Sequence, residues 1–421
     1  MIQRLELLPG ITLRCISDDR FKHGCLSIQL IRPMCREEAA LNALLPAVLL
    51  RGTTRYPDLR AITLRLDDLY GASVGTLAQR IGDRQTTGFY CSFTEDRYAM
   101  EGDAILEPFI GFVGELLRDP LLEQGVFRAD FVESEKKNLL STIASQLNDK
   151  RSYAMGRLMK HMCREDSLGV PRLGSPRQVE AITPEGLYDH YRRILRESPV
   201  ELFFVGSASA EQVARLLRPL FEDLERQPVI LPTQTAFHSC EPREITEEMD
   251  VNQARLCMGF ATPVTIRDGE FVAMQVMNLV FGGGVTGKLF MEIREKQSLC
   301  YAIGSAYHAT KGILTVAAGI DSHQADNVRA RVLEQLQACR DGKITQEELD
   351  SAKQALLSSL SGVQDSPGAM ENYYASAAQS GLKLSVEAYM EAVRAVTAEQ
   401  VAAAAQKVEL HTVYLLKGVS R

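Results

Sequence analysis

Metal binding is the first chemistry to look for in this chain, because two histidines one helical turn apart can reach a single zinc ion. The chain has seven histidines, at positions 23, 161, 190, 238, 308, 323 and 411. None is followed four positions later by a second histidine. The nearest cluster is His161, Cys163 and Glu165, which isolated surface side chains explain better than a metal centre does.

Two glycine-containing segments imitate catalytic motifs without the context that those motifs need. Gly282-x-x-x-x-Gly287-Lys288 begins like a phosphate-binding loop, but Leu289 stands where serine or threonine would hold magnesium. Residues 71–75 fit a Gly-x-Ser-x-Gly nucleophile elbow, yet a helical pattern precedes the serine and a strand pattern follows it, the reverse of an elbow. We therefore expect neither nucleotide binding nor serine hydrolysis.

The segment 35–57 resembles the zinc-binding segment of the pitrilysin and mitochondrial-processing-peptidase family. That family carries an inverted His-x-x-Glu-His motif, followed shortly by Gly-Thr and then by Tyr-Pro. Gly52-Thr53 and Tyr56-Pro57 match this frame. The resemblance extends over nearly the whole chain. Within the family, the chain resembles a catalytically degenerate bacterial branch that is associated with modification of elongation factor P.

In this frame the metal-binding residues are replaced. Ala43 and Ala47 occupy the two histidine positions, and Pro46 occupies the position of the glutamate that acts as general base. The resemblance places the third ligand, a glutamate, seven residues after Glu135, where this chain has Thr142. Alanine has no donor atom and proline no carboxylate, so we expect no catalytic residue, no bound metal and no other cofactor.

The resemblance also covers the residues around the missing site. Segment 69–76 is similar to the family's Gly-x-x-Asn-Ala segment beside the zinc, with Gly75 at the asparagine position. Segment 279–290 is similar to its glycine-rich turn, and segment 292–301 to its Leu-Arg-Glu-x-x-Gly-Leu-x-Tyr motif, with Ser298 in place of the glycine.

Arg294 and Tyr301 match an arginine and a tyrosine that help to hold the substrate backbone in active members of the family. Guanidinium and phenol groups can both donate hydrogen bonds to a peptide. The resemblance implies that these two residues bind substrate. The alternative is that Arg294 pairs with Glu292 or Glu295 and that Tyr301 belongs to the core.

Composition bounds the class of protein. The 421 residues are 45% hydrophobic and 24% charged, which is typical of a soluble globular protein with more than one domain. A net charge of -7 argues against a nucleic-acid partner. Nine cysteines without a Cys-x-x-Cys pair, no visible secretory signal and no apolar run long enough for a membrane span favour a cytoplasmic protein.

The proline-rich segment 226–242 reads as a linker between an N-terminal domain, 1–225, and a C-terminal domain, 243–421. Both halves end alike. Thr183 and Thr397 are each a potential helix N-cap, and each helix is followed by a Val-Glu-Leu strand that ends in glycine, at 200–206 and at 408–418. The sequence therefore predicts an internal duplication.

Apolar periodicity predicts an α+β fold. Helical patterns cover Asp58 to Tyr70, Phe131 to Leu147, Glu211 to Leu224, Phe271 to Val280, Ala325 to Cys339 and Gln346 to Leu360, and strand patterns cover Leu26 to Leu30, Phe89 to Phe93 and Ile313 to Ile320. The alternation of polar and apolar residues favours antiparallel sheets with helices on one face over a parallel sheet. The resemblance implies two such halves arranged as a clam shell.

The leading hypothesis is a non-catalytic subunit that pairs with an active zinc-bearing homologue and forms half of a chamber enclosing peptide substrates. The alternative is a stand-alone homodimer that binds peptides, like a chaperone, without cutting them. A peptidase with a relocated metal site is a third possibility, for which no ligand spacing is visible.

Overall fold

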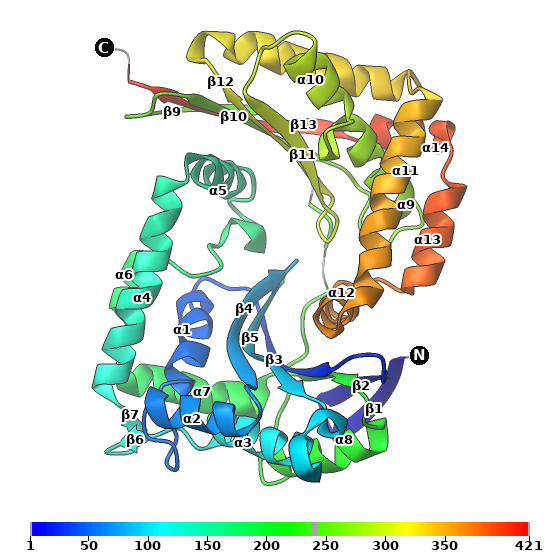
Figure 1. The fold of residues 1–421 in the computed structure, drawn as a ribbon. Coiled ribbons are helices and arrows are strands. Elements are labelled where there is room, and N and C mark those ends of the chain that lie inside the picture. Colours follow the sequence, from blue (N-terminus) through cyan, green and yellow to red (C-terminus); the bar gives the residue numbers. More distant parts are fainter. Residues whose placement is uncertain (1, 234, 238–241, 420–421) are drawn as a thin grey trace. The chain divides into compact units, whose positions relative to one another are not determined.

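The computed structural model describes residues 2–233, 235–237 and 242–419, and the chain forms two compact units (Figure 1). The first unit contains Met1–Ala144, Val170–Pro232 and Gln364–Ser376, and the second contains Ser145–Gly169, Thr233–Val363 and Ala377–Arg421. Gln234 and residues 238–241 of the predicted linker, with His238 and Cys240, lie outside the described residues.

The first unit is built on a sheet with strand order β1-β2-β8-β3-β5-β4. The strands are β1 (Ile2–Leu8), β2 (Ile11–Ser17), β3 (His23–Pro33), β4 (Ser73–Ile81), β5 (Arg84–Thr94) and β8 (Val200–Gly206), and a small hairpin joins β6 (Leu122–Glu123) to β7 (Val126–Phe127). Its helices are α1 (Ala39–Leu49), α2 (Leu59–Asp68), α3 (Leu106–Arg118), most of α4 (Ala129–Asn148), α6 (Pro176–Glu180), α7 (Pro184–Glu197) and α8 (Ala210–Leu217). All neighbouring strands are antiparallel except β2 and β8.

The second unit is built on a sheet with strand order β11-β12-β10-β13-β9. The strands are β9 (Arg243–Met249), β10 (Ala254–Ala261), β11 (Ala302–His308), β12 (Ile313–Ile320) and β13 (Glu409–Gly418). Its helices are α5 (Lys150–Met162), α9 (Phe271–Asn278), α10 (Ala325–Arg340), α11 (Gln346–Ser361), α13 (Val386–Ala395) and α14 (Ala398–Gln406), with π-helical turns η5 (Leu279–Gly283) and η6 (Leu289–Glu295). Only β13 and β9 are parallel neighbours.

The two sheets share one topology. Strands β2, β3, β4, β5 and β8 follow one another along the chain as β9, β10, β11, β12 and β13 do, and they take the same places in their sheets. Each sheet has its single parallel pair at the same position, β2 with β8 and β9 with β13. This match supports the predicted duplication and confirms antiparallel-rich sheets covered by helices.

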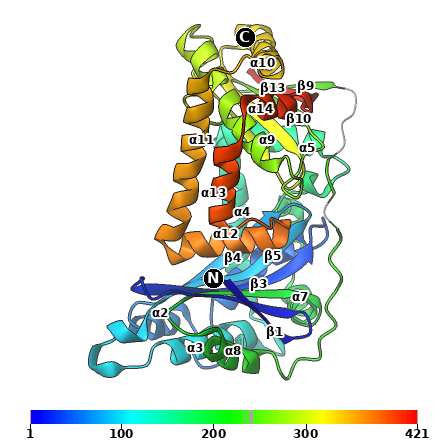
Figure 2. The same cartoon turned by 90° about the vertical axis from the view of Figure 1, so that its right-hand side faces the viewer.

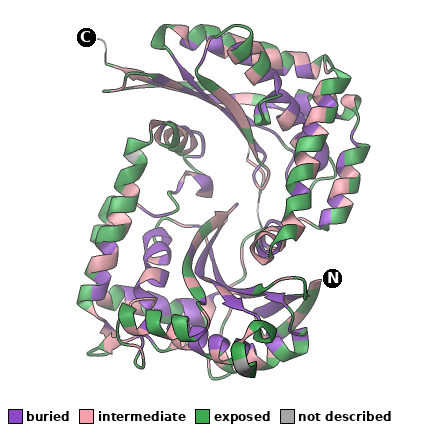
Figure 3. Ribbon diagram, in the orientation of Figure 1, coloured by how far each residue is buried: buried purple, intermediate pink, exposed green. Residues whose placement is uncertain are grey.

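Each unit contains one helix from the other half of the chain. Helix α12 (Pro367–Ser380) lies mainly in the first unit (Figure 2). Its Met370 packs against Ile16, Cys25 and Val205. Helix α5 lies in the second unit, where its Ala154 and Leu158 pack with residues of β10 and β13. The exchanged helices cover the sheet faces that the other helices leave open, so β3 and β10 are buried on both faces (Figure 3).

All six predicted helices are present with shifted ends. The largest difference is α8, which ends at Leu217 instead of Leu224. Pro219 follows within a short 3-10 turn (Arg218–Leu220), and proline has no N–H to donate to the carbonyl four residues earlier. The predicted caps are confirmed, since the Thr183 side chain accepts from the Gly186 N–H and that of Thr397 from the Gln400 N–H.

Candidate functional site

A pocket of about 390 Å³ in the first unit brings together the residues that stand in the degenerate metal positions. Ala43 and Ala47 come from α1, and Thr142 comes from α4. Thr76 to Gln79 of β4 and the segment Arg172-Leu173 complete much of the wall. The alignment that predicted these positions therefore selected residues that lie around one space.

The pocket offers few donor atoms for a metal ion. Among the described residues that line it, Glu135 is the only carboxylate, and it is paired with Arg51 at 3.3 Å and accepts a hydrogen bond from the Asn138 amide at 3.0 Å. The Thr142 hydroxyl donates to the Asn138 carbonyl at 2.9 Å. Two methyl groups, one engaged hydroxyl and one engaged carboxylate do not form a zinc-binding set.

Pro46 lies inside α1, where a proline leaves the carbonyl four residues earlier without its helical donor. That carbonyl belongs to Asn42, and it accepts a hydrogen bond from the Thr87 hydroxyl at 2.8 Å instead. Asn42 and Thr87 are both buried. The hydrogen bond from β5 therefore replaces the helical hydrogen bond that Pro46 removes from α1. Nothing replaces the carboxylate of the general base at this position.

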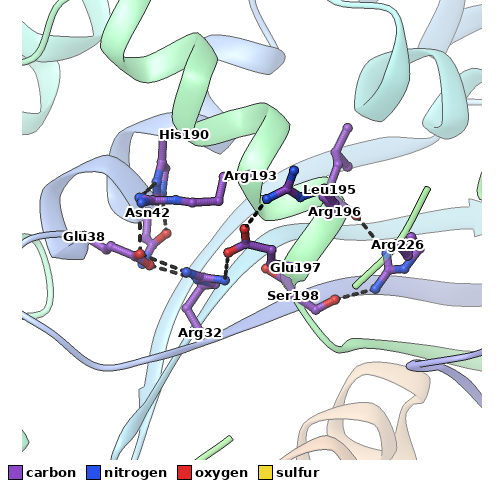
Figure 4. A network of polar contacts seen from close by, with 10 residues as sticks. All are labelled: Arg32, Glu38, Asn42, His190, Arg193, Leu195, Arg196, Glu197, Ser198 and Arg226. Atoms are coloured by element: carbon purple, nitrogen blue, oxygen red, sulfur yellow. Dashed lines mark hydrogen bonds and ion pairs between the residues drawn. The ribbon is translucent and has the colours of Figure 1, made fainter. Parts of the chain in front are cut away.

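Further polar contacts fix α1 in the core (Figure 4). The Asn42 side chain donates to Gln85 at 2.8 Å and lies 2.8 Å from Nε2 of His190. Arg193 donates to Nδ1 of His190, so Nε2 carries the proton and donates to Asn42. Burial lowers the pKa of His190 to about 4, which keeps this imidazole neutral at physiological pH.

Glu38, at the start of α1, receives two hydrogen bonds of 2.8 Å from Arg32 and lies 3.2 Å from Arg193. Burial by itself would raise the pKa of Glu38, but the contacts with Arg32 lower it overall. Arg32 also lies 3.5 Å from Glu197. The network that remains around the degenerate motif is therefore structural, and it holds α1 against β3 and α7.

Strand β4 forms one wall of the pocket and is an edge strand among the described strands of the first sheet. Gly75 lies on this strand opposite Tyr90 of β5. The guanidinium of Arg172 donates to the Ala78 carbonyl, so part of the edge is already hydrogen-bonded. Thr76, Leu77 and Gln79 of this edge strand also line the pocket, so their backbone lies beside it.

Arg294 and Tyr301 lie in the second unit. Arg294, at the end of η6, lies 3.3 Å from Glu295 and packs over the ring of Phe290 at 4.6 Å. The alternative expectation that Arg294 pairs with a neighbouring glutamate therefore describes its contacts. Tyr301 is 54% exposed and donates to Asp321 at 2.9 Å, so the alternative that it belongs to the core is wrong.

A larger cavity, about 590 Å³, was not predicted from the sequence. It lies in the second unit, between the first turns of α5 and strands β11 and β12, and Gly282, Gly283 and Gly284 form part of its wall. The ring of Phe290, on which Arg294 packs, also lines it. The run of small residues along β11 and β12 was the signal that could have revealed it.

The segments that imitate other motifs have structural roles. Lys288 is buried and paired with Glu348 at 2.7 Å. Ser73 is the first residue of β4 and follows a helix, as expected for a segment that is not an elbow. His161 stacks on Tyr414. In the described part of the chain, no group of three potential metal-binding side chains occurs and no helix has the length and apolarity of a membrane span.

Comparisons with known protein families and curated proteins point to one family. Residues 181–356 match the family described as "Peptidase M16 inactive domain". A probable inactive metalloprotease, YmfF of Bacillus subtilis (strain 168), is 29% identical over 409 residues, which cover 97% of this chain and 96% of that protein. The uncharacterized zinc protease Mb2805c of Mycobacterium bovis is 30% identical over 302 residues, 69% of this chain and 68% of that protein.

Solved structures agree on the fold. A conserved protein from Enterococcus faecalis V583 superimposes with a TM-score of 0.94 at 25% identity, covering 100% of this chain and 99% of that one. A peptidase M16 inactive domain from Pseudomonas fluorescens gives a TM-score of 0.82 at 19% identity, covering 100% of this chain and 98% of the other.

Proposed function

This chain belongs to the peptidase M16 family as an inactive homologue, and we propose that it is the non-catalytic subunit of a zinc-endopeptidase-type complex. In this proposal it pairs with a separate homologue that carries an intact zinc motif. The two chains together enclose a chamber for peptides. All metal chemistry, namely activation of the attacking water, takes place in the partner.

The observation that carries the proposal is the pocket around Ala43, Ala47 and Thr142. Its surroundings retain the family's architecture, while the positions that would hold zinc carry no suitable donor atoms. Buried contacts such as that between Asn42 and Thr87 still fix α1, which indicates that the folded structure around the pocket is still needed. Retention of the fold without the ligands favours a role in which surface and shape matter.

Two features support peptide binding. Strand β4 presents an edge beside the pocket, and an extended peptide can add to such an edge through backbone hydrogen bonds. In the second unit, Arg294 and Tyr301 are partly exposed, with Arg294 paired with Glu295 and the Tyr301 hydroxyl donating to Asp321. The proposed role of these two residues is to contact the substrate backbone once the chamber is assembled.

We propose the cytoplasm as the compartment. The eight cysteines that the structure describes form no disulfide with one another, and seven of them are buried. Burial raises the pKa of Cys15 and Cys300 to about 11, so these thiols are protonated and unreactive at neutral pH. Unpaired cysteines of this kind fit a reducing environment.

Copurification and cleavage test the proposal. The chain is expressed alone and together with a homologue from the same genome that has an intact His-x-x-Glu-His motif. We expect zinc and cleavage of an unstructured peptide only in the preparation that contains the homologue, with the two chains in equal amounts. Cleavage by this chain alone, or failure of the two chains to copurify, would contradict it.

The second candidate is a homodimer that holds peptides without cutting them. The cavity of about 590 Å³ favours it, because its wall is complete within one unit of this chain. The same purification separates the two candidates. A homodimer that binds peptide and does not associate with the zinc-bearing homologue would support the second candidate.

A further inference from the structure

Two adjoining cavities lie on one face of the second sheet. The larger has a volume of about 590 Å³ and the smaller about 190 Å³. Arg151, Ile303 and Ala317 line both, so the cavities are neighbours. Neither cavity includes Arg294 or Tyr301.

The strand register explains why this space is open. Arg255 on β10 lies opposite Gly319 on β12, and Cys257 lies opposite Ala317, so these residues share one sheet face. It is the face covered by α5, because Cys257 packs with Ala154 and Leu158. The neighbouring positions on the same face carry small side chains: Ala302, Gly304 and Ala306 on β11, and Thr315, Ala317 and Gly319 on β12. Side chains of this size leave room between the sheet and the start of α5.

Two guanidinium groups border the smaller cavity. Arg255 packs directly over Gly319, where an added Cβ would lie 2.1 Å from its Nη1 atom. Its Nε atom is buried and has no hydrogen-bond partner among the described residues. Arg151 reaches the cavity from α5, and within the described chain no carboxylate forms an ion pair with Arg151 or Arg255. Two positive charges thus face one small space without an ion-paired carboxylate among the described residues.

The start of α5 strengthens this positive potential. Its first turn carries Lys150 and Arg151 and no acidic residue, although the positive end of the helix dipole favours acidic side chains there. The Asp149 carboxylate caps the helix, accepting from the Arg151 N–H at 3.0 Å and from the Ser152 hydroxyl. It therefore caps the backbone, and it also interacts electrostatically with the charge of Arg151, without a direct ion pair between the two side chains.

We propose that Arg151 and Arg255 bind a carboxylate of an acidic peptide whose neighbouring residues occupy the larger cavity. Guanidinium groups form paired, charge-assisted hydrogen bonds with carboxylates. Met155, Val285 and Phe290 give the larger cavity an apolar wall, which fits a peptide better than an inorganic anion. The inference rests on the proposed function and names its substrate class, namely peptides that carry Glu, Asp or a C-terminal carboxylate.

Fluorescence anisotropy with the full chain tests this site. The probes are three labelled peptides of one sequence: one with a central Glu and an amidated C-terminus, one with Gln and an amidated C-terminus, and one with Gln and a free C-terminus. We expect the Glu or the free-carboxylate peptide to bind at least about tenfold more tightly than the neutral peptide, since a charge-assisted pair contributes roughly 1.4 kcal/mol or more. Which of the two binds tightly identifies the carboxylate.

Four variants locate the effect. Arg151→Gln and Arg255→Gln should each abolish the preference, whereas Arg331→Gln, which removes a partly exposed arginine on α10, should not. Gly319→Ala keeps every charge but displaces the Arg255 guanidinium, so it should weaken the preference as well. Unfolding midpoints of all variants report whether they are folded.

Equal affinity for acidic and neutral peptides, no detectable binding of either, or an equal loss in Arg331→Gln would overturn the carboxylate site. So would displacement by inorganic phosphate without any peptide preference, which would indicate a small-anion site. These outcomes concern the chain alone. They are therefore distinguishable from a failure to copurify with a zinc-bearing homologue, which bears on the proposed function.

Discussion

At the scale of single residues, the degenerate pocket differs from a metal site by four side chains whose effects are not independent. Ala43 and Ala47 lack donor atoms, Thr142 donates to the backbone of its own helix, and Pro46 is integrated through the bond between Asn42 and Thr87. A single ligand binds zinc weakly, because zinc in proteins has three or four protein ligands. Restoring a single ligand at one of these positions should therefore not restore zinc binding.

The combined variant Ala43→His/Ala47→His/Thr142→Glu is expected to bind about one zinc per chain, since three protein ligands suffice for such a site. Each single variant should remain free of zinc. Because Pro46 is retained, the triple variant should still fail to cleave peptides. Metal analysis and a cleavage assay give both readouts, and stoichiometric zinc in any single variant would show that the pocket is not organised as described.

His190 predicts a pH effect. Burial lowers its pKa from 6.5 to about 4, so the folded state holds the neutral imidazole. A group of this kind contributes stability above pH 6.5 and loses it as the pH falls towards 4. The full effect is about 3 kcal/mol, from roughly 1.4 kcal/mol per pKa unit.

We expect His190→Gln to lose less free energy of unfolding between pH 7 and pH 4 than the unmodified chain, by up to about 3 kcal/mol. Denaturant titrations at several pH values measure the difference. His323→Gln, at an exposed position, serves as the control. Parallel pH curves for the His190 variant and the unmodified chain would refute this account of the network.

At the scale of elements, each exchanged helix is fastened to its sheet through a carboxylate. On α12, Oε1 of Glu371 accepts from the Ser27 hydroxyl at 2.6 Å and from the Gln29 amide at 2.8 Å. Burial raises the pKa of Glu371, although these two hydrogen bonds act in the opposite direction. On α5, Tyr153 and Arg157 bind Glu247 of β9.

Glu371→Gln is expected to equal or exceed the unmodified chain in stability above neutral pH. A carboxyl with a raised pKa contributes stability below its unfolded pKa of 4.5 and loses it as the pH rises. Glutamine keeps a carbonyl oxygen that can accept from both Ser27 and Gln29. Urea unfolding at pH 5 and pH 8 tests this, and a variant that is weaker at pH 8 than at pH 5, relative to the unmodified chain, would contradict it.

Glu247→Ala is expected to destabilise the protein by about 1–3 kcal/mol, because it leaves the hydroxyl of buried Tyr414 and two partly buried donors without their acceptor. The donors are Tyr153 at 2.5 Å, Tyr414 at 2.8 Å and the Arg157 guanidinium at 2.8 Å. Glu248→Ala, the neighbouring position with an exposed pair to Lys417, should change stability by under about 1 kcal/mol. Equal effects of the two substitutions in urea unfolding would argue against this anchor.

The periodicity of apolar residues predicted the helices and strands better than it predicted which of them pack together. Helices such as α11 and strands such as β12 follow from periodicity, since their apolar residues repeat at the spacing of one buried face. The exchange of α5 and α12 was not predicted, because a helix's apolar stripe does not specify which sheet covers it. The polar residues Ser27 and Gln29 on a buried face of β3 were the available signal. Their burial is explained by the hydrogen bonds that they donate to Glu371 of α12.

At the scale of the molecule, duplication explains why the site could be only partly predicted. Resemblance located the residues around the pocket, because frame residues such as Gly52 and Thr53 remain. The cavity between α5 and the second sheet depends on a helix from the other half of the chain and on strand register. Neither can be read from residue spacing along the chain.

Pairing predicts an asymmetric response to substitution. In a complex with a zinc-bearing homologue, replacing the glutamate of the homologue's motif should abolish cleavage, since that residue activates the attacking water. Thr142→Ala in this chain should leave cleavage unchanged, because Thr142 has no part in the chemistry. Loss of cleavage in the Thr142→Ala complex, with both chains still associated, would contradict the assignment of catalysis to the homologue alone.

The most direct measurement is the zinc content of the purified unmodified chain after equilibration with a small excess of zinc and removal of unbound metal. The pocket lined by Ala43, Ala47 and Thr142 predicts far less than one zinc per chain. One tightly held zinc per chain that is lost when a residue of this pocket is altered would contradict the account.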